Sequence, residues 1–354
     1  MKINSQTISQ LIQVRDCWLN PKYELRQQAI DKASIEFGLS KENFTLALDW
    51  IFSEWHEDNF LEMIKHCPFT GISNAIQILA GNTPAVIAQA FLQGVILQVP
   101  QIIKASSRCI LFPQLIHQSF SSISKRLSQL FYLEHNHESA NFKDKIKAAD
   151  LVIAYGNDAS IANIKKYLSS KTIFIGHGHA GSAAIILKEA ANNDSLEKLA
   201  WDMLSYDQRG CLSPRVTFVQ QGGQLQPAEC AKLFASKILS KYALKLPRGC
   251  LFSGEAAAIL QARSVYRFRG QVYEGSDWTV CFDEKLSWPE ESLPRFMPFK
   301  SFISLQELKP LLKSMDNNLL SIGYSGNESY LKSIVSQPIK LFPLGKMQQQ
   351  LLCW

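Results

Sequence analysis

The feature that most constrains the fold of this chain is an alternation of short apolar strands with helices. Residues 76–80 are expected to form a strand, residues 84–97 a helix and residues 101–104 a second strand. Pro84 suits the first helical turn, because the N–H that proline lacks would have no partner there. A strand, helix, strand unit implies that the two strands are parallel.

The same pattern recurs further along the chain. A strand is expected over 150–155, a helix over 159–168 and a strand over 172–175, and another helix is expected to begin near Ser182. Each strand runs into glycine. Short buried strands that end in glycine and alternate with helices indicate a doubly wound, nucleotide-binding α/β domain.

A further amphipathic helix is expected over 194–206, before a strand over 215–219. Asp194 and Glu197 have the spacing of an N-cap pair. Gly210 can end the helix in a left-handed conformation.

The length of 354 residues favours two domains. Residues 1–207 are expected to form a cofactor-binding domain with a helical N-terminal region over 1–70. A composition shift near Gln208 suggests that a catalytic domain occupies 208–354. Three prolines predict a loop over 287–298.

Composition and charge exclude several classes of function. Hydrophobic residues make up 46% and charged residues 19%, as in an ordinary globular protein. The net charge of +6 fits an anionic ligand such as a nucleotide or coenzyme A. The sequence contains no run of Lys and Arg long enough to bind along a phosphate backbone, so no nucleic-acid partner is expected. The apolar stretch 85–103 contains four glutamines and Pro100, which argues against a membrane span.

The cysteines are scattered and show neither a C-x-x-C pair nor zinc-finger spacing. Free thiols and the absence of an apolar secretory segment at the start predict a reducing, cytoplasmic location. The eight are Cys17, Cys67, Cys109, Cys211, Cys230, Cys250, Cys281 and Cys353.

Cys211 differs from the other cysteines because it is expected in a turn between a helix and a strand. A thiol there can reach a pocket and act as a nucleophile that forms a thioester. The alternative is an unremarkable thiol. A helix C-terminus disfavours a thiolate, so Arg209, Arg215 or a bound cofactor would have to compensate. No Cys/His dyad can be inferred.

Two residues follow the first strands of the predicted domain. Asn82 can donate to a developing oxyanion, although its position favours a cap on the following helix. Lys104 ends a parallel strand, where it can reach a ribose or phosphate. A solvated lysine is the alternative.

The segment 176–181 reads Gly-His-Gly-His-Ala-Gly. Its glycines match the pattern G-x-G-x-x-G in an expected strand-to-helix turn, where backbone N–H groups approach a phosphate. No convincing acidic residue follows about 20 positions later. His177 and His179 could ligate a metal, but no matching ligand cluster exists, so no metal is expected.

These segments together resemble a known family. The motif Asp-Gln-Arg-Gly-Cys-Leu-Ser-Pro-Arg at 207–215 closely resembles the cysteine motif of the LuxC-type long-chain acyl-CoA reductases, which belong to the aldehyde dehydrogenase superfamily. The turn 81–84 and the segment 104–107 are similar to the superfamily's asparagine turn and lysine-containing strand end. The segment 176–181 lies where that superfamily's glycine turn contacts the cofactor.

The resemblance implies an aldehyde dehydrogenase-like fold, with two doubly wound Rossmann-like domains and a cleft between them. It implies that Cys211 accepts the acyl group and that Asn82 is an oxyanion donor. NADPH is the implied cofactor, and a homo-oligomer is compatible with the likeness. The implied cofactor site comprises Lys104, Gly156, Gly176, His177, Gly178 and Gly181.

One departure bears on the reaction. Hydrolytic aldehyde dehydrogenases carry a Glu-Leu-Gly-Gly-Lys segment before the cysteine, and its glutamate activates water. No such segment lies between Gly181 and Cys211, and Glu189 and Glu197 lack that context. This departure argues against hydrolysis to the acid and suits an enzyme that exchanges acyl groups with a thiol. The resemblance implies NADPH-dependent reduction of a fatty acyl thioester to the aldehyde. The acyl donor would be acyl-CoA, an acyl-carrier protein or an acyl-transferring partner enzyme.

Two alternatives remain open at this point. The chain could be an acylating semialdehyde dehydrogenase that acts on a short substrate. It could also be a nucleotide-binding module without catalysis.

Overall fold

The computed structural model describes residues 3–134, 140–178, 180–315, 318–335 and 338–349. The chain folds into two compact units. The first contains the described residues of Met1–Phe37, Phe44–His179 and Gln349–Trp354, and the second contains those of Gly38–Asn43 and Ala180–Gln348. The division after position 179 places the segment 180–207 with Cys211, whereas composition suggested a change near Gln208.

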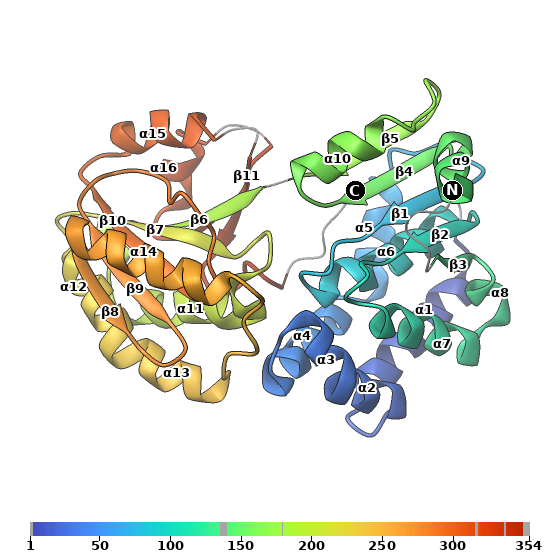
Figure 1. The fold of residues 1–354 in the computed structure, drawn as a ribbon, viewed down its shortest axis with the longest axis horizontal. Coiled ribbons are helices and arrows are strands. Elements are labelled where there is room, and N and C mark those ends of the chain that lie inside the picture. Colours follow the sequence, from blue (N-terminus) through green and yellow to red (C-terminus); the bar gives the residue numbers. More distant parts are fainter. Residues whose placement is uncertain (1–2, 135–139, 179, 316–317, 336–337, 350–354) are drawn as a thin grey trace. The chain divides into compact units, whose positions relative to one another are not determined.

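The first unit is built on a five-stranded sheet in the order β3-β2-β1-β4-β5, with every pair parallel (Figure 1). The expected strand, helix, strand units are therefore confirmed. Chain order reverses at β1, so the β1/β4 boundary is a topological switch point. The strands are β1 (Ala75–Ile78), β2 (Gln101–Lys104), β3 (Phe131–Glu134), β4 (Leu151–Tyr155) and β5 (Ile173–His177).

Helices make up the N-terminal region of this unit, as predicted, and connect its strands. Trp18 anchors their packing: its ring stacks on Phe52 with centroids 5.1 Å apart, and Phe112 meets it edge-on at 5.7 Å. Pro84 occupies the first turn of α6, as expected. The helices are α1 (Ser5–Leu19), α2 (Glu24–Gln28), a π-helical turn (Ala29–Ala33), α3 (Ser34–Phe37), α4 (Lys41–Ser53), α5 (Glu57–Lys65), α6 (Pro84–Leu97), α7 (Leu111–Ile123), α8 (Lys125–Ser128), α9 (Ala140–Ala148) and α10 (Asp158–Lys165).

The second unit contains a seven-stranded sheet in the order β12-β11-β6-β7-β10-β9-β8. All pairs are parallel except β8 with β9, which is antiparallel. Buried residues such as Ile185, Phe218 and Ile322 form a core with helix α15. The strands are β6 (Gly181–Ile186), β7 (Pro214–Gln220), β8 (Gln271–Glu274), β9 (Thr279–Asp283), β10 (Phe296–Phe302), β11 (Leu319–Ser325) and β12 (Lys340–Pro343).

The helices of the second unit correct two local expectations. Helix α11 is capped by Asn192, whose side chain accepts from Ser195 N–H, rather than by Asp194. Strand β10 begins within the segment expected to be a loop. The helices are α11 (Asn193–Leu204), α12 (Pro227–Leu233), a π-helical segment (Phe234–Leu239), α13 (Ser240–Lys245), α14 (Glu255–Arg269), α15 (Leu305–Lys313) and α16 (Glu328–Lys332), with 3-10 turns at Lys188–Ala190 and Ser205–Gln208.

Within the described ranges, no helix has both the length and the apolar character needed to cross a bilayer.

Candidate active site

The carboxyl edge of the five-stranded sheet gathers several residues singled out from the sequence. The register pairs Ile78 with Lys104 and with Ala154, and it pairs Ala154 with Gly176. Lys104 and Gly176 therefore lie at the same edge, where open α/β sheets bind their ligands. Gly156 joins them, because its N–H donates to the carbonyl of His177 at 3.1 Å.

Asn82 lies just beyond β1 and is exposed. It does not cap α6: the N-cap is Thr83, and no side-chain capping hydrogen bond is formed there. The capping interpretation is therefore wrong, and the role of oxyanion donor stays a prediction. The preceding Gly81 packs tightly, since a Cβ there would lie 2.9 Å from both Cys109 Sγ and Ser106 Oγ.

Lys104 brings a positive charge to this edge. Its side chain is half-buried, and desolvation lowers the pKa of its ammonium while nearby Glu134 works in the opposite direction. Its Nζ lies 5.8 Å from the ring centroid of Phe142. A partly desolvated cation at the end of a parallel strand is well suited to bind a phosphate or ribose.

The glycine segment 176–181 departs from the predicted strand, turn, helix arrangement. Gly176 and His177 belong to β5, and Gly181 begins β6, so the helix expected near Ser182 is wrong. The pattern match thus lacks the helix that would hold a pyrophosphate. A cofactor role for Gly176, His177 and Gly178 stays a prediction.

Two residues of that segment have specific packing. A Cβ at Gly178 would lie 2.6 Å from Asp158 Oδ1, so the backbone comes very close to the start of α10. The ring of His177 stacks on Tyr155 with centroids 4.4 Å apart, and burial lowers the pKa of the imidazole. Burial therefore favours the neutral form of the His177 imidazole.

No group of three or more His, Cys, Asp or Glu side chains with metal-binding geometry occurs among the described residues. His179, the second histidine considered as a ligand, lies outside them.

Cys211 lies in the turn that leads into β7, as expected, and is exposed. The backbone that precedes Cys211 is unusual, because Tyr206, Asp207 and Gln208 all have positive φ, at 54°, 51° and 62°. Gly210 is not left-handed, so the predicted glycine C-cap is wrong. Left-handed residues other than glycine cost about 1–2 kcal/mol each, so this run must be offset by other contacts.

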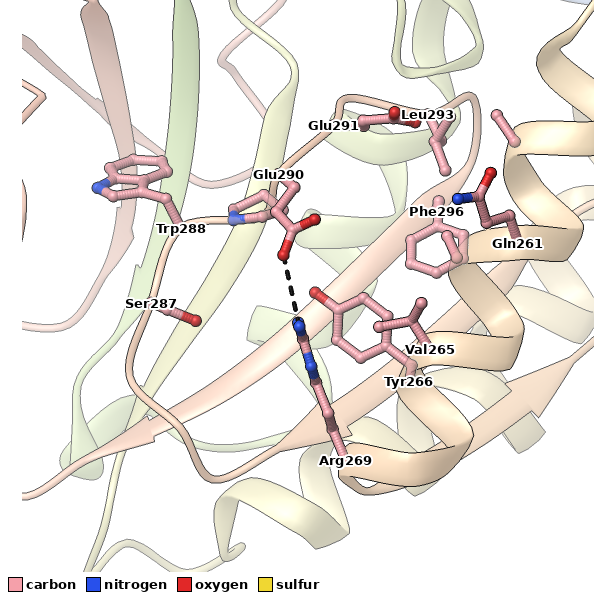
Figure 2. Close-up of a pocket in the computed structure, with 13 residues that line it drawn as sticks. Gln261, Val265, Tyr266, Arg269, Ser287, Trp288, Glu290, Glu291, Leu293 and Phe296 are labelled. Atoms are coloured by element: carbon pink, nitrogen blue, oxygen red, sulfur yellow. Dashed lines mark hydrogen bonds and ion pairs between the residues drawn. The ribbon is translucent and has the colours of Figure 1, made fainter.

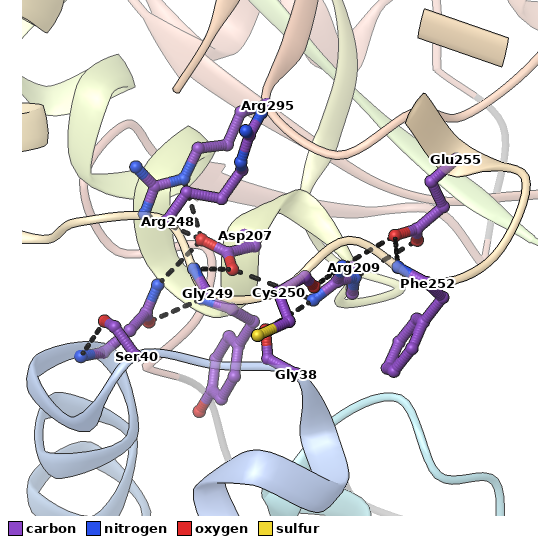
Figure 3. Close-up of polar contacts among 12 residues, drawn as sticks. Gly38, Ser40, Asp207, Arg209, Arg248, Gly249, Cys250, Phe252, Glu255 and Arg295 are labelled. Atoms are coloured by element: carbon purple, nitrogen blue, oxygen red, sulfur yellow. Dashed lines mark hydrogen bonds and ion pairs between the residues drawn. The ribbon is translucent and has the colours of Figure 1, made fainter. Parts of the chain in front are cut away.

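Asp207 is the centre of those contacts (Figure 3). Arg295 Nε donates to its Oδ1 at 2.7 Å, and both side chains are 0% exposed. The N–H of Gly249 donates to Oδ2 at 3.0 Å, and Asn43 Nδ2 donates to Oδ1 at 3.3 Å. Burial raises the pKa of Asp207, and the Arg295 guanidinium acts in the opposite direction.

The residues on either side of Asp207 are also held. The N–H of Tyr206 donates to Asn43 Oδ1 at 2.9 Å. The amide of Gln208 donates to the carbonyls of Pro214 at 2.8 Å and Phe296 at 3.1 Å, and accepts from the N–H of Phe296 at 2.8 Å. Each left-handed residue therefore has a buried polar partner.

Arg209, considered from the sequence as a partner of the thiolate, is bound elsewhere. Its guanidinium donates to the carbonyls of Gly38 at 3.0 Å and Cys250 at 2.9 Å, and pairs with Glu255 at 2.9 Å (Figure 3). It also covers the Phe252 ring at 4.6 Å. Arg209 therefore ties the turn to the segment 249–255.

The electrostatics at Cys211 depend on Arg215 and on backbone N–H groups. Desolvation by the surrounding protein raises the pKa of the thiol, although the residue reaches solvent. The N–H groups of Cys211 and Leu212 and the charge of Arg215 lower it. Hence the thiolate faces a desolvation cost and three features that stabilise negative charge.

Gly181 has a role that sequence reasoning missed. A Cβ there would lie 2.6 Å from Arg215 Nε. Arg215 Nη2 donates to the carbonyl of Ala180 at 2.6 Å, so the guanidinium lies directly over the glycine. The backbone of Gly181, which has no side chain, makes room for the guanidinium whose charge lowers the pKa of Cys211.

The other thiols are less suited to catalysis. Cys109, Cys230 and Cys281 are buried, and burial raises the pKa of the first two to about 12. Cys17 and Cys67 are partly buried. Cys250 alone shares the exposure of Cys211 within the described ranges, which makes it the natural control.

The glutamates considered as activators of water have other partners. Glu189 Oε1 accepts from the N–H of Asn327 at 3.1 Å, and Glu197 Oε2 accepts from the hydroxyl of Tyr242 at 2.9 Å.

A separate pocket lies between α14 and the segment 287–296 (Figure 2). Its volume is about 80 Å³, and its walls are mainly apolar, with an ion pair between Arg269 and Glu290 at 3.4 Å. No site residue expected from the sequence lines it. Phe296 connects it to the cysteine turn, because its backbone bonds to Gln208.

Comparison with protein families gives a match over nearly the whole chain. Residues 2–350 match the family model described as acyl-CoA reductase (LuxC). A long-chain acyl-protein thioester reductase of Aliivibrio fischeri is 24% identical over 352 residues, with 90% of this chain and 71% of that protein covered. A long-chain acyl-protein thioester reductase 2 of Photobacterium leiognathi is 24% identical over 247 residues, with 67% of this chain and 51% of that protein covered.

Solved structures share the fold at low sequence identity. An oxidoreductase from Marinobacter aquaeolei has a TM-score of 0.75 at 12% identity, with 96% of this chain and 78% of that chain covered. The NADP-dependent glyceraldehyde-3-phosphate dehydrogenase from Bacillus halodurans, in complex with NADP, has a TM-score of 0.72 at 11% identity, with coverage of 97% and 79%. The putative aldehyde dehydrogenase PutA from Anabaena variabilis scores 0.71 at 14% identity, with coverage of 97% and 80%. The aldehyde dehydrogenase-like α/β fold is thereby confirmed.

Proposed function

Because the chain belongs to the LuxC family of acyl-CoA reductases, we propose that it reduces a fatty acyl thioester to the aldehyde through an acyl-enzyme on Cys211, with NADPH. The observation that carries this proposal is the cysteine turn. An exposed thiol on a firmly held turn, with two N–H groups and a guanidinium acting on its sulfur, suits a nucleophile in acyl transfer.

The first half-reaction transfers the acyl group. The Cys211 thiolate attacks the carbonyl carbon of the donor, and the carbonyl oxygen gains the negative charge. The tetrahedral intermediate then expels the donor thiolate, leaving the acyl group on Cys211. Backbone N–H groups at the turn are the type of donor that stabilises such an oxyanion.

The second half-reaction needs a hydride, which NADPH supplies when bound. The acyl carbon gains that hydride, and its oxygen carries the negative charge of a thiohemiacetal anion that remains attached to Cys211. The C–S bond then breaks as the C=O bond re-forms, so the aldehyde leaves and the thiolate is restored. The first half-reaction is readily reversible, because the acyl-enzyme and its donor are both thioesters.

The residues at the first sheet's carboxyl edge fit a dinucleotide. The switch point between β1 and β4 is the usual position of the crevice that binds one. Lys104 would hold a phosphate or ribose. Gly156, Gly176 and Gly178 present backbone without side chains, and a Cβ at Gly178 would lie 2.6 Å from Asp158 Oδ1.

The acyl donor belongs to the proposal as well. The relatives' names describe reductases of acyl-protein thioesters, so a protein-bound acyl group is an expected donor beside acyl-CoA. Initial rates with acyl-CoA and with the same acyl group on a carrier protein would rank the two. A scan of acyl chain length would separate this activity from that of a short-chain semialdehyde dehydrogenase.

NADPH oxidation with matched aldehyde formation tests the proposed function. The wild type and Cys250→Ser should both turn over, whereas Cys211→Ser should lose all measurable activity and still bind NADPH. Turnover by Cys211→Ser at the wild-type rate would assign the chemistry to another group. The implied role of Asn82 is tested in the same way: Asn82→Ala should slow acylation about 10²–10³-fold, as lost oxyanion donors do.

A further inference from the structure

The ion pair between Asp207 and Arg295 joins two residues that both have left-handed backbones. Asp207 has a φ of 51° and Arg295 a φ of 49°. Neither side chain is exposed, and their atoms approach to 2.7 Å. Such conformations persist only where the surroundings enforce them, and they are found most often at functional sites.

The pair is placed to control the geometry of the cysteine turn. Asp207 is the middle of the three left-handed residues, and the chain from there to Cys211 is only a few residues long. Arg295 precedes Phe296, whose backbone both donates to and accepts from Gln208. Arg295 and Phe296 therefore hold two successive left-handed residues, Asp207 and Gln208.

The far end of the turn is held independently. The hydroxyl of Ser182 donates to the carbonyl of Cys211 at 3.0 Å and shares a hydrogen bond of 2.8 Å with Ser321. With both ends fixed, a change in the backbone at 206–208 has to be taken up near Cys211.

We propose that Asp207 and Arg295 are positioning residues, whose buried ion pair enforces the left-handed run and thereby sets where the Cys211 sulfur and the adjacent N–H groups lie. This inference rests on the proposed function of Cys211 as the acyl acceptor. Neither residue takes part in the chemistry. Their effect is on the geometry of attack, where a small misplacement costs a large part of the rate.

Asp207→Asn is the decisive variant. Asparagine has nearly the same shape and tolerates the left-handed region at least as well as aspartate, so the change removes charge without adding backbone strain. The matched control is Asp283→Asn, which breaks the buried pair of Asp283 with Lys300 at 2.6 Å. In the described part of the chain, that pair makes no hydrogen bond or ion pair with residues 206–213.

Two rates are measured for each variant, in a Cys250→Ser background and well below all melting temperatures. One is the single-turnover rate of Cys211 acylation at saturating acyl-CoA, and the other is alkylation of Cys211 by iodoacetamide at high pH. Asp207→Asn should slow acylation about tenfold or more, with KM little changed and alkylation nearly unchanged. Asp283→Asn should change neither rate.

Substitutions at Arg295 test whether the pair acts as a unit. Arg295→Met should match Asp207→Asn, and Arg295→Lys should recover part of the rate. The double variant Asp207→Asn with Arg295→Met should be no slower than the slower single variant. If the losses in acylation rate add in the double variant, or if Asp283→Asn slows acylation equally, the pair would be a general stabilising contact without a positioning role.

The outcomes separate this inference from the proposed function. Acylation of the wild type at Cys211, with an unchanged rate in folded Asp207→Asn, would overturn the positioning role alone. No acylation of Cys211 in the wild type would overturn the proposed function, and the inference with it.

Discussion

The side-chain amide of Gln348 donates a hydrogen bond of 3.1 Å to the hydroxyl of Ser213, two residues after Cys211. Gln348 also lies against Gly210 on the other side of the cysteine, where a Cβ would come within 2.9 Å of its Oε1. A residue from the end of the second unit thus contacts the cysteine turn on both sides of Cys211.

Gln348→Ala should therefore weaken both the fold and the acyl transfer. Loss of one largely buried hydrogen bond should lower the free energy of unfolding by about 1 kcal/mol. Gln221→Ala is the control, because Gln221 makes the same type of bond, to Ser301 at 3.3 Å. Chemical denaturation and acylation kinetics measure the two effects. Equal acylation rates in the two variants would show that Gln348 does not support the turn.

Asp202 predicts a specific dependence of stability on pH. It accepts from the N–H groups of Gly345 at 2.6 Å and Met347 at 3.0 Å, yet burial raises its pKa to about 7. The folded state thus holds the proton more tightly than the unfolded chain, where the pKa is about 3.9. The stability contributed by the protonated carboxyl is full below about pH 4 and is lost as pH rises to about 7.

Asp202→Asn should remove this dependence, because the amide does not titrate. The free energy of unfolding of the wild type minus that of the variant should fall from pH 5 to pH 8 and then level off. Denaturation at fixed ionic strength measures this difference. A difference that stays constant or rises with pH would contradict the assigned titration.

Gly181→Ala should shift the titration of the Cys211 thiol. In the wild type, the charge of the Arg215 guanidinium lowers the pKa of Cys211. The added methyl group would displace that guanidinium. The pH at which iodoacetamide alkylates Cys211 at half its maximal rate should therefore rise. Arg215→Met should shift it in the same direction, and the combined variant no further. An unchanged midpoint in both single variants would exclude Arg215 as the compensating charge.

Lys104→Met should weaken binding of the dinucleotide. A charge-assisted hydrogen bond contributes about 1.5–3 kcal/mol, so the Kd for NADPH should rise on the order of tenfold or more. Lys147→Met, at an exposed position of α9, is the control for general charge. Fluorescence titration with NADPH gives both constants. Equal affinities for NADPH in the two variants would show that Lys104 does not bind the dinucleotide.

Local patterns predicted four of the five strands of the first unit, because each of the four is a short apolar run next to a turn; β3 was not predicted. The apolar runs at β1, β2, β4 and β5 and the proline at the start of α6 lie within a residue or two of their expected positions. Short apolar runs bounded by turn residues are consistent with the strands of a parallel sheet of this kind.

The cysteine turn shows where such reasoning stops. Its position between α11 and β7 was predictable, but its geometry was not. Gly210 was expected to be left-handed because glycine adopts that conformation easily. Instead, three larger residues adopt it, because Asn43, Arg295 and Phe296 bond to them from distant parts of the chain. No local pattern carries that information.

The prediction of a strand, turn, helix arrangement at residues 176–181 was wrong for a related reason. Its spacing matched a phosphate-binding turn, but the chain leaves one sheet after His177 and enters another at Gly181. Only the tertiary structure shows that Gly181 faces Arg215. A motif of three glycines specifies where backbone can come close, not what it comes close to.

The central claim is that the sulfur of Cys211 carries the acyl group during turnover. The most direct measurement is peptide mass spectrometry of the wild-type protein after incubation with a long-chain acyl-CoA without NADPH. We expect the mass of one acyl group on the peptide that contains Cys211, none on the peptide that contains Cys250, and loss of that mass as aldehyde when NADPH is added. Aldehyde formation with Cys211 unmodified throughout, or equally fast in Cys211→Ser, would contradict the account.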